Sequence, residues 1–231
     1  MIYHGINYIP NPSNDLLNIA QDLAVQSISK FSSPDVKFVS LQFRGEDAAP
    51  NADISVALDR DSLGITERRL PFVLDIFNNI ANLCTDKDDW IGFTNSDIVI
   101  KSETFYSEIR NSASKALLFN RVEIQDVELT RELDKFLNYS GKPNPFNGRD
   151  GFFFRKEIWD IIKTKLPDYI IAEPRWDIGF IKLLKEYDPK VVENQIYHYS
   201  HPYRWKENTP GAIYNNSLFV KQKAEAINNQ I

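Results

Sequence analysis

Residues 89–100 constrain the fold of this chain more than any other segment. Residues 90–93 form an apolar run without polar alternation, as expected for a strand that is covered on both faces. A polar break follows at residues 95–97, and the apolar run resumes at residues 98–100. The break therefore places the Asp97 carboxylate at the end of a buried strand, where an α/β enzyme would hold a metal ion or a phosphate group.

The length and composition predict one folded domain. A chain of 231 residues can bury one sizeable core but is short for two large domains. Its hydrophobic content of 42% and charged content of 26% are typical of an ordinary globular protein. We therefore expect a single domain over residues 1–231. The net charge of −5, without a basic block, disfavours a nucleic-acid-binding surface, so we expect no nucleic acid among the partners.

The cysteine content and the N-terminal sequence bear on location. The single cysteine, Cys84, rules out an intramolecular disulfide and fits a reducing compartment. Residues 1–5 do not begin a signal peptide, and no stretch reaches the roughly 20 apolar residues of a membrane span. We expect a soluble, cytoplasmic protein without a transmembrane segment. Peripheral association with a membrane, through a partner or a lipid-linked substrate, stays open.

Predicted strands and helices alternate along the chain. Strands are predicted at residues 2–9, 36–43, 54–58, 90–93, 116–119 and 152–154. Helices are predicted after a cap at Ser13 or Asn14, at 70–84, at 102–110 with a Ser102 cap, and at 158–166, 176–187 and 218–227. This order indicates an α/β fold with a mainly parallel central sheet flanked by helices. Residues 121–146 are polar and irregular, which predicts an insertion over one end of the sheet.

The first four predicted strands all end in polar residues. These ends are residues 7–11, Arg44, residues 59–61 and residues 95–97. Ligands of an open parallel sheet bind beyond the carboxyl ends of its strands, so we expect these residues to converge on one crevice. A hard cation such as Mg²⁺ or Mn²⁺ prefers oxygen ligands and shares them with a diphosphate, so one carboxylate and one amide can suffice. Acids also occur at 86–88, but a solvated connection explains these more simply, so the buried context favours 95–97.

Residues 68–76 (RRLPFVLDI) lead into residues 93–98 (FTNSDI), and these two segments carry a family resemblance. Together with the order of elements over residues 1–120, they resemble GT-A fold glycosyltransferases, of the nucleotide-diphospho-sugar transferase type. That family places a variant Asp-x-Asp motif after this helix. The resemblance implies that residues 1–120 form the nucleotide-sugar-binding half and that residues 121–231 form the acceptor-side half.

Within this resemblance, Asp97 occupies the position of the metal-binding carboxylate, and Asn95 stands where the motif has its first acid. The implied cofactor is Mn²⁺ or Mg²⁺. The family commonly completes its metal site with a late histidine, for which His201 and His198 are the candidates. His201 is favoured, because it lies just after a predicted strand, where a ligand can face the crevice. The alternative is that both histidines are solvated residues of an aromatic edge strand within 195–205.

An inverting transfer needs a general base near the acceptor hydroxyl, and in such folds this is an acid from the acceptor-side half. Asp150, Glu173 and Asp177 qualify by position. Each also has a structural alternative, because Asp150 can shape the turn at 148–151 and the other two acids can favour the first turn of a helix. A retaining transfer requires no such base, and the sequence leaves the stereochemistry open.

Basic residues are candidates for binding the nucleotide and its phosphates. Arg68 and Arg69 precede the helix at 70–84, and guanidinium groups bind phosphate in a bidentate manner. Arg204, near the late histidines, is an alternative clamp for the diphosphate. Asp59, at the end of the third strand, is a further candidate for contacting the donor. The alternative for the arginines is a solvated surface position.

The leading hypothesis is a glycosyltransferase that moves a sugar from a nucleoside-diphosphate sugar donor to a saccharide or lipid-linked acceptor, as in polysaccharide biosynthesis. A sugar nucleotidyltransferase is less favoured, because such enzymes carry a Gly-rich basic loop after the first strand. Residues 9–12 (IPNP) contain neither glycine nor a basic residue. The third interpretation is a non-catalytic sugar- or protein-binding domain of the same fold, with Asn95 as its main support.

Overall fold

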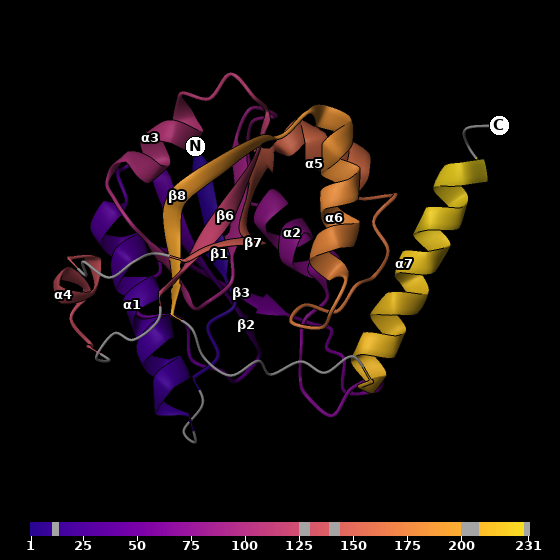
Figure 1. Ribbon diagram of the computed structural model, residues 1–231, viewed down its shortest axis with the longest axis horizontal. Helices are drawn as coiled ribbons and strands as arrows, with labels where there is room; N and C mark the ends of the chain where they lie inside the picture. Colours follow the sequence, from indigo (N-terminus) through magenta and orange to yellow (C-terminus); the bar gives the residue numbers. More distant parts are fainter. Residues whose placement is uncertain (11–13, 125–129, 139–143, 200–207, 229–231) are drawn as a thin grey trace.

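The computed structural model describes residues 1–10, 14–124, 130–138, 144–199 and 208–228. Within these ranges one eight-stranded sheet has the strand order β3-β2-β1-β4-β7-β6-β8-β5 (Figure 1). The strands are β1 (Ile2–Ile6), β2 (Val36–Phe43), β3 (Ile54–Leu58), β4 (Trp90–Thr94), β5 (Ile98–Ile100), β6 (Ala116–Ile124), β7 (Asn144–Arg155) and β8 (Lys190–Tyr199). The helices are α1 (Asp15–Phe31), α2 (Val73–Ala81), α3 (Thr104–Arg110), α4 (Leu133–Leu137), α5 (Lys156–Ile162), α6 (Trp176–Leu184), the 3₁₀ helix η1 (Lys185–Tyr187) and α7 (Pro210–Asn228).

The sheet is parallel in its N-terminal half and mixed beyond it. β1 lies between β2 and β4, β3 flanks β2, and these three pairings are parallel. β7 runs antiparallel to both of its neighbours, β4 and β6, whereas β6 and β8 are parallel again. β5 pairs antiparallel with β8. The predicted α/β class with a mainly parallel sheet is confirmed, and the reversed strand β7 brings residues 148–150 to the carboxyl end of β4.

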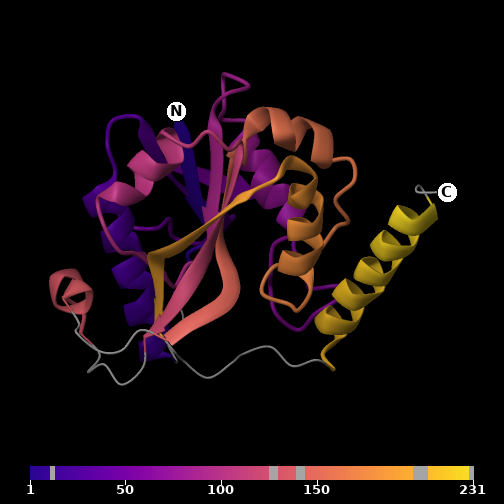
Figure 2. The ribbon, with the colours of Figure 1, turned by 45° about the horizontal axis from the view of Figure 1, so that its top comes forward.

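Helices cover both faces of the sheet (Figure 1, Figure 2). Buried side chains of α1 and α3 pack on one face, and those of α2, α5 and α6 pack on the other. Trp90 belongs to the first core, whereas Ile91 and Phe93 belong to the second. This two-sided burial is the reason for the unbroken apolar run in β4. On the second face, Phe77 of α2 stacks on Phe180 of α6 with their ring centroids 4.7 Å apart.

Local capping explains where α1 begins but not where α3 begins. The Asn14 side chain accepts a hydrogen bond of 3.0 Å from the backbone N–H of Leu17, as predicted for the start of α1. The cap predicted at Ser102 is wrong. The Ser102 hydroxyl lies 2.8 Å from that of Thr104, and α3 starts at Thr104 without a side-chain cap. The helix predicted at 70–84 is α2, which is shorter at both ends.

The irregular insertion predicted at 121–146 is wrong at both of its ends. β6 continues to Ile124 and β7 already begins at Asn144. Arg121 and Glu123 are polar because they form an ion pair, with 2.8 Å between Arg121 Nε and Glu123 Oε1, inside β6. Both side chains are largely buried. A strand that buries paired charges lacks the apolar alternation from which strands are predicted, so the sequence pattern pointed to a loop.

The C-terminal elements also differ from expectation. β8 lies between β6 and β5, so it is an interior strand rather than the edge strand considered for residues 195–205. α7 begins at Pro210, well before the helix predicted at 218–227, and it packs against α6 on the outside of the molecule (Figure 2). In the described ranges, no helix combines the length and the apolar character that crossing a bilayer requires.

Candidate active site

A cavity of about 1140 Å³ lies at the carboxyl ends of β1 and β4. Asn7 and Ile9 follow β1, residues 95–97 follow β4, and all of them line the cavity. The rest of the lining includes residues 148–150 of β7 and the loop before α6. Open α/β sheets bind their ligands at this edge. The volume is at or above the roughly 300–1,000 Å³ that is typical of small-molecule sites.

Asp150 is the centre of a polar cluster on the cavity wall. Asn95 Nδ2 donates a hydrogen bond of 2.7 Å to Asp150 Oδ1, and Arg121 Nη1 donates one of 2.7 Å to Asp150 Oδ2. Burial raises the pKa of Asp150, and the nearby Arg121 charge opposes this rise. Both carboxylate oxygens are therefore engaged by side chains from other elements. Through these two contacts, Asp150 holds the loop after β4 against β6.

His198 lies between two carboxylates in the next part of the wall. Its Nδ1 is 2.9 Å from Glu123 Oε2, and its Nε2 is 3.4 Å from Asp97 Oδ2. Burial would lower the pKa of His198, but the hydrogen bonds to Asp97 and Glu123 outweigh burial and raise it to about 9. The pKa of Glu123 is lowered in spite of burial, by its hydrogen bond with His198 and by the charges of His198 and Arg121. His198 is thus an imidazolium at neutral pH.

Asp97 and His198, two of the residues predicted to bind a metal ion, face each other at this point. Glu123 holds Nδ1 of His198 while Nε2 points to Asp97, which is how a carboxylate commonly orients a metal-binding histidine. No group of three or more His, Cys, Asp or Glu side chains in the described ranges is placed to hold a metal ion. Mg²⁺ and Mn²⁺ can take their other ligands from a diphosphate and water, so this donor pair fits such an ion once His198 has lost its proton.

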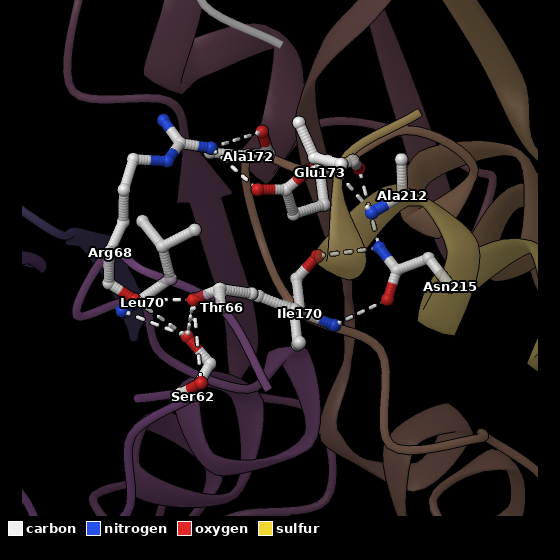
Figure 3. A network of polar contacts seen from close by, with 10 residues as sticks. Ser62, Thr66, Arg68, Leu70, Ile170, Ala172, Glu173, Ala212 and Asn215 are labelled. Carbon is white, nitrogen blue, oxygen red and sulfur yellow. Dashed lines mark hydrogen bonds and ion pairs between the residues drawn. The ribbon is translucent and has the colours of Figure 1, made fainter. Parts of the chain in front are cut away.

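Glu173 lines the cavity and joins segments that are far apart in the sequence (Figure 3). Arg68 Nη2 donates hydrogen bonds to Glu173 Oε1 over 2.7 Å and to the Ala172 carbonyl over 3.3 Å. The Thr209 hydroxyl donates to the other carboxylate oxygen of Glu173 over 3.0 Å. Glu173 is buried, whereas Arg68 is half-exposed. Both oxygens of Glu173 are therefore occupied, and its role is to position Arg68 at the cavity.

Backbone contacts extend this network on both sides (Figure 3). Asn215 of α7 accepts a hydrogen bond of 2.9 Å from the Ile170 N–H and donates one of 2.8 Å to the Ile170 carbonyl. The hydroxyls of Thr66 and Ser62 donate to the Arg68 carbonyl over 2.5 and 3.1 Å. The Asn215 contacts fix the start of α7 to the loop before α6. The Thr66 and Ser62 hydroxyls fix the backbone of Arg68.

Asp177 differs from the other two predicted catalytic acids. It lines the cavity in the first turn of α6, and it forms no ion pair with any residue that the structure describes. Burial raises the pKa of Asp177, and backbone hydrogen bonds at the helix start oppose this rise. The preceding loop contains two non-glycine residues in the left-handed region, Ala172 (φ 59°) and Arg175 (φ 81°). Such conformations cost about 1–3 kcal/mol each and cluster at functional sites.

The sequence matches no protein-family model and no curated protein. The fold, in contrast, has solved counterparts. The mannosyltransferase PcManGT from Pyrobaculum calidifontis, solved in complex with GDP-Man and Mn²⁺, is similar over 98% of this chain and 64% of that chain, with a TM-score of 0.51 and 12% identity. This chain has a GT-A-like fold.

Two further solved structures are similar at lower scores. The 2-C-methyl-D-erythritol 4-phosphate cytidylyltransferase of Francisella tularensis has a TM-score of 0.45 and 16% identity, over 83% of this chain and 89% of that one. A putative nucleotide-diphospho-sugar transferase of Desulfovibrio desulfuricans has a TM-score of 0.46 and 9% identity, over 96% of both chains. The similarity to PcManGT confirms the predicted GT-A resemblance for the fold.

The GT-A-like fold brings most of the predicted site residues to one cavity. Those that line it are Arg68, Arg69, Asn95, Asp97, Asp150, Glu173, Asp177 and His198. Asp59 is not among the lining residues, because it is exposed and pairs with Arg44 at the surface over 3.0 Å. The predicted convergence of all four strand ends is therefore wrong for Arg44 and Asp59. His201 and Arg204 lie outside the described residues.

Sequence reasoning missed four charged residues of this candidate site. Arg121, Arg149 and Arg175 line the cavity, and Glu123 holds His198. The sequence carried one usable signal, since Arg121 and Glu123 are two positions apart shortly after the apolar run at 116–119 and so share a face of an extended strand.

Proposed function

We propose that this protein is a glycosyltransferase, which moves a sugar from a nucleoside-diphosphate sugar to a hydroxyl group of a saccharide or lipid-linked acceptor. One observation carries the proposal: Asp177, an acid with a raised pKa and no ion pair to a described residue, lines the same cavity as Arg68 and Asp97. Such a transfer requires cationic groups for the diphosphate and a base for the hydroxyl proton.

The donor would bind along the wall formed by Arg68, Arg69 and residues 95–97. Glu173 and the Arg68 backbone contacts hold the Arg68 guanidinium at the cavity, so little side-chain entropy remains to be lost when it binds a phosphate. A divalent ion bound by Asp97 and His198 would offset the charge of the diphosphate leaving group. Asn95 and Asp150 would keep Asp97 in place by fixing the loop after β4.

The acceptor hydroxyl would approach from the side of α6. We assign Asp177 as the general base, because Asp150 and Glu173 have both carboxylate oxygens engaged by other side chains. A base works best when its pKa lies near the operating pH, and burial shifts the pKa of Asp177 in that direction. Because a general base on the acceptor side is what an inverting transfer requires, this assignment implies that the transfer inverts the configuration of the sugar.

Nucleotidyl transfer is the other chemistry that similar folds host, so fold alone does not choose between the two. The residues after β1 favour glycosyl transfer. Asn7 and Ile9 line the cavity there, and neither carries a charge for the triphosphate that a nucleotidyltransferase must bind.

The test begins with thermal unfolding in the presence of UDP-, GDP-, CMP- and dTDP-linked sugars, with and without Mn²⁺. A ligand at 100 times its dissociation constant adds about 2.7 kcal/mol to the free energy of unfolding. We expect one nucleotide class to stabilise the wild type and Asp134→Ala, whose side chain is exposed and pairs with Lys30, but not Asp97→Ala.

The stabilising sugar nucleotide is then incubated with hydroxyl acceptors. Release of the nucleoside diphosphate supports the proposal. Pyrophosphate release from a nucleoside triphosphate and a sugar 1-phosphate would assign nucleotidyl transfer instead. If no nucleotide stabilises the protein, the proposal is wrong.

A further inference from the structure

Among the described residues, five arginines line the cavity, and they fall into two groups. Three form ion pairs with carboxylates of the chain itself: Arg68 with Glu173, Arg69 with Asp61, and Arg121 with Asp150 and Glu123. The other two, Arg149 and Arg175, form no ion pair within the described ranges. A cavity that holds two such guanidinium groups is suited to an anion.

Arg149 carries a buried donor without a partner. It lies in β7 next to Asp150, and its Nε is buried and makes no hydrogen bond within the described part of the chain. A buried donor without a partner loses its hydration without compensation, and this is most unfavourable for a charged group. An anionic group in the cavity would provide the missing acceptor.

Arg175 stands beside the proposed base. It is the residue before the first turn of α6, it is exposed, and it adopts the left-handed conformation that non-glycine residues rarely take. It lies two residues before Asp177, and its positive charge counteracts the effect of burial on the pKa of Asp177. An anion held by Arg175 would therefore lie close to the hydroxyl that Asp177 deprotonates.

We propose that Arg149 and Arg175 form a subsite for an anionic acceptor, one that carries a phosphate or carboxylate group near the hydroxyl to be glycosylated. This inference rests on the proposed function, and it narrows the acceptor class. Guanidinium groups bind both oxyanions through paired N–H donors, which a neutral sugar cannot match. Arg175 puts the subsite on the acceptor side, because it lies two residues before Asp177. Arg149 lines the same cavity next to Asp150.

The test measures binding without turnover. Glucose 6-phosphate, glucuronate and glucose are titrated calorimetrically into the protein, with and without the nucleoside diphosphate that stabilises it most. We expect the two anionic probes to bind and glucose not to bind, and the stronger of the two identifies phosphate or carboxylate as the preferred group. Arg149→Gln and Arg175→Gln should each weaken anion binding at least about tenfold. Arg175→Lys should weaken it less, and Arg44→Gln, whose exposed side chain pairs with Asp59 and is not part of the cavity lining, should leave it unchanged.

Three results would overturn the subsite. The first is that glucose binds as tightly as the anionic probes. The second is that both Gln variants bind the anionic probes as tightly as the wild type does. The third is that the Gln variants weaken the binding of the nucleoside diphosphate but not that of the anionic probes. Arg175 is exposed, so its variant keeps the test valid if Arg149→Gln does not fold, which circular dichroism would reveal. Failure of the proposed function is a separate observation, namely that no nucleotide sugar stabilises the protein or releases nucleoside diphosphate.

Discussion

Asn95, which follows β4, donates a hydrogen bond of 2.7 Å to the carboxylate of Asp150 in β7. The two positions are 55 residues apart in the sequence. A carboxylate at position 95 would meet the Asp150 carboxylate at hydrogen-bond distance. An amide at position 95 therefore suits the Asp150 carboxylate, whereas an acid there would repel it.

Asn95→Asp should destabilise the protein more than Asn95→Ala does at neutral pH. The Ala variant only loses a hydrogen bond to a charged group, worth about 1.5–3 kcal/mol, whereas the Asp variant adds repulsion between two carboxylates. Because one proton shared by the pair relieves this repulsion, the difference between the variants should shrink as the pH is lowered toward 5. Urea denaturation at neutral pH and at pH 5 measures this difference in the free energy of unfolding. Equal stability of the two variants at neutral pH would contradict the account.

Asp177→Asn should lower kcat by about 10²–10⁴-fold, which is the usual contribution of a general base. Donor binding should be unchanged, because the donor wall does not include this side chain. Steady-state kinetics with the identified donor, together with calorimetry, check both parts. Asp134→Asn is the matched control, since it removes the charge of an exposed carboxylate far from the cavity lining. A full kcat in Asp177→Asn would assign the base elsewhere.

Gly211→Ala should destabilise the protein by about 1 kcal/mol. A Cβ atom at Gly211 would lie 2.7 Å from Glu173 Cδ, and Glu173 cannot move freely because Arg68 and Thr209 hold its oxygens. The overpacking cost of about 1–3 kcal/mol exceeds the gain in helix propensity of about 1 kcal/mol. Gly64→Ala is the control, since no atom lies within 4 Å of its added Cβ. Chemical denaturation should separate the variants, and equal stabilities would refute the clash.

His4 should make the protein less stable in acid. It is fully buried, with its ring nitrogens 2.7 Å from the Tyr106 hydroxyl and 2.9 Å from the Thr94 hydroxyl, and burial lowers its pKa to about 3. Between pH 6.5 and 3 the unfolded chain binds a proton at this residue that the folded protein does not bind. The free energy of unfolding therefore falls with decreasing pH, by about 1.4 kcal/mol per pH unit for this one group.

His4→Gln is the variant that isolates this effect. It should be less stable than the wild type near neutral pH, because it changes a buried hydrogen-bonded side chain. Between pH 6.5 and 3, its free energy of unfolding should change less steeply with pH than that of the wild type. The difference in slope corresponds to at most one bound proton. Urea denaturation across this range measures the slope, and parallel curves for the two proteins would show that His4 is protonated in the folded state.

Local pattern predicted those parts of the fold whose physical cause is local. The apolar runs of β2 and β4 follow from burial on both faces, and the start of α1 follows from an Asn14 cap three residues before its bonded partner. The same reasoning failed at Arg121 and Glu123, because besides pairing with each other they pair with Asp150 and His198, which come from other strands. No local pattern reports such partners.

By itself, the sequence determined the α/β class, the position of Asp97 after a buried strand, and a short set of candidate acids and arginines. Only the tertiary structure decided which acid is free of side-chain partners. Arg121, 29 residues from Asp150, and Arg68, 105 residues from Glu173, engage two of the candidates. Asp177 has no such partner in the described ranges. The physical reason is that periodicity and capping act over one or two turns, whereas charge pairing and burial depend on residues that meet only when the sheet and its helices have assembled.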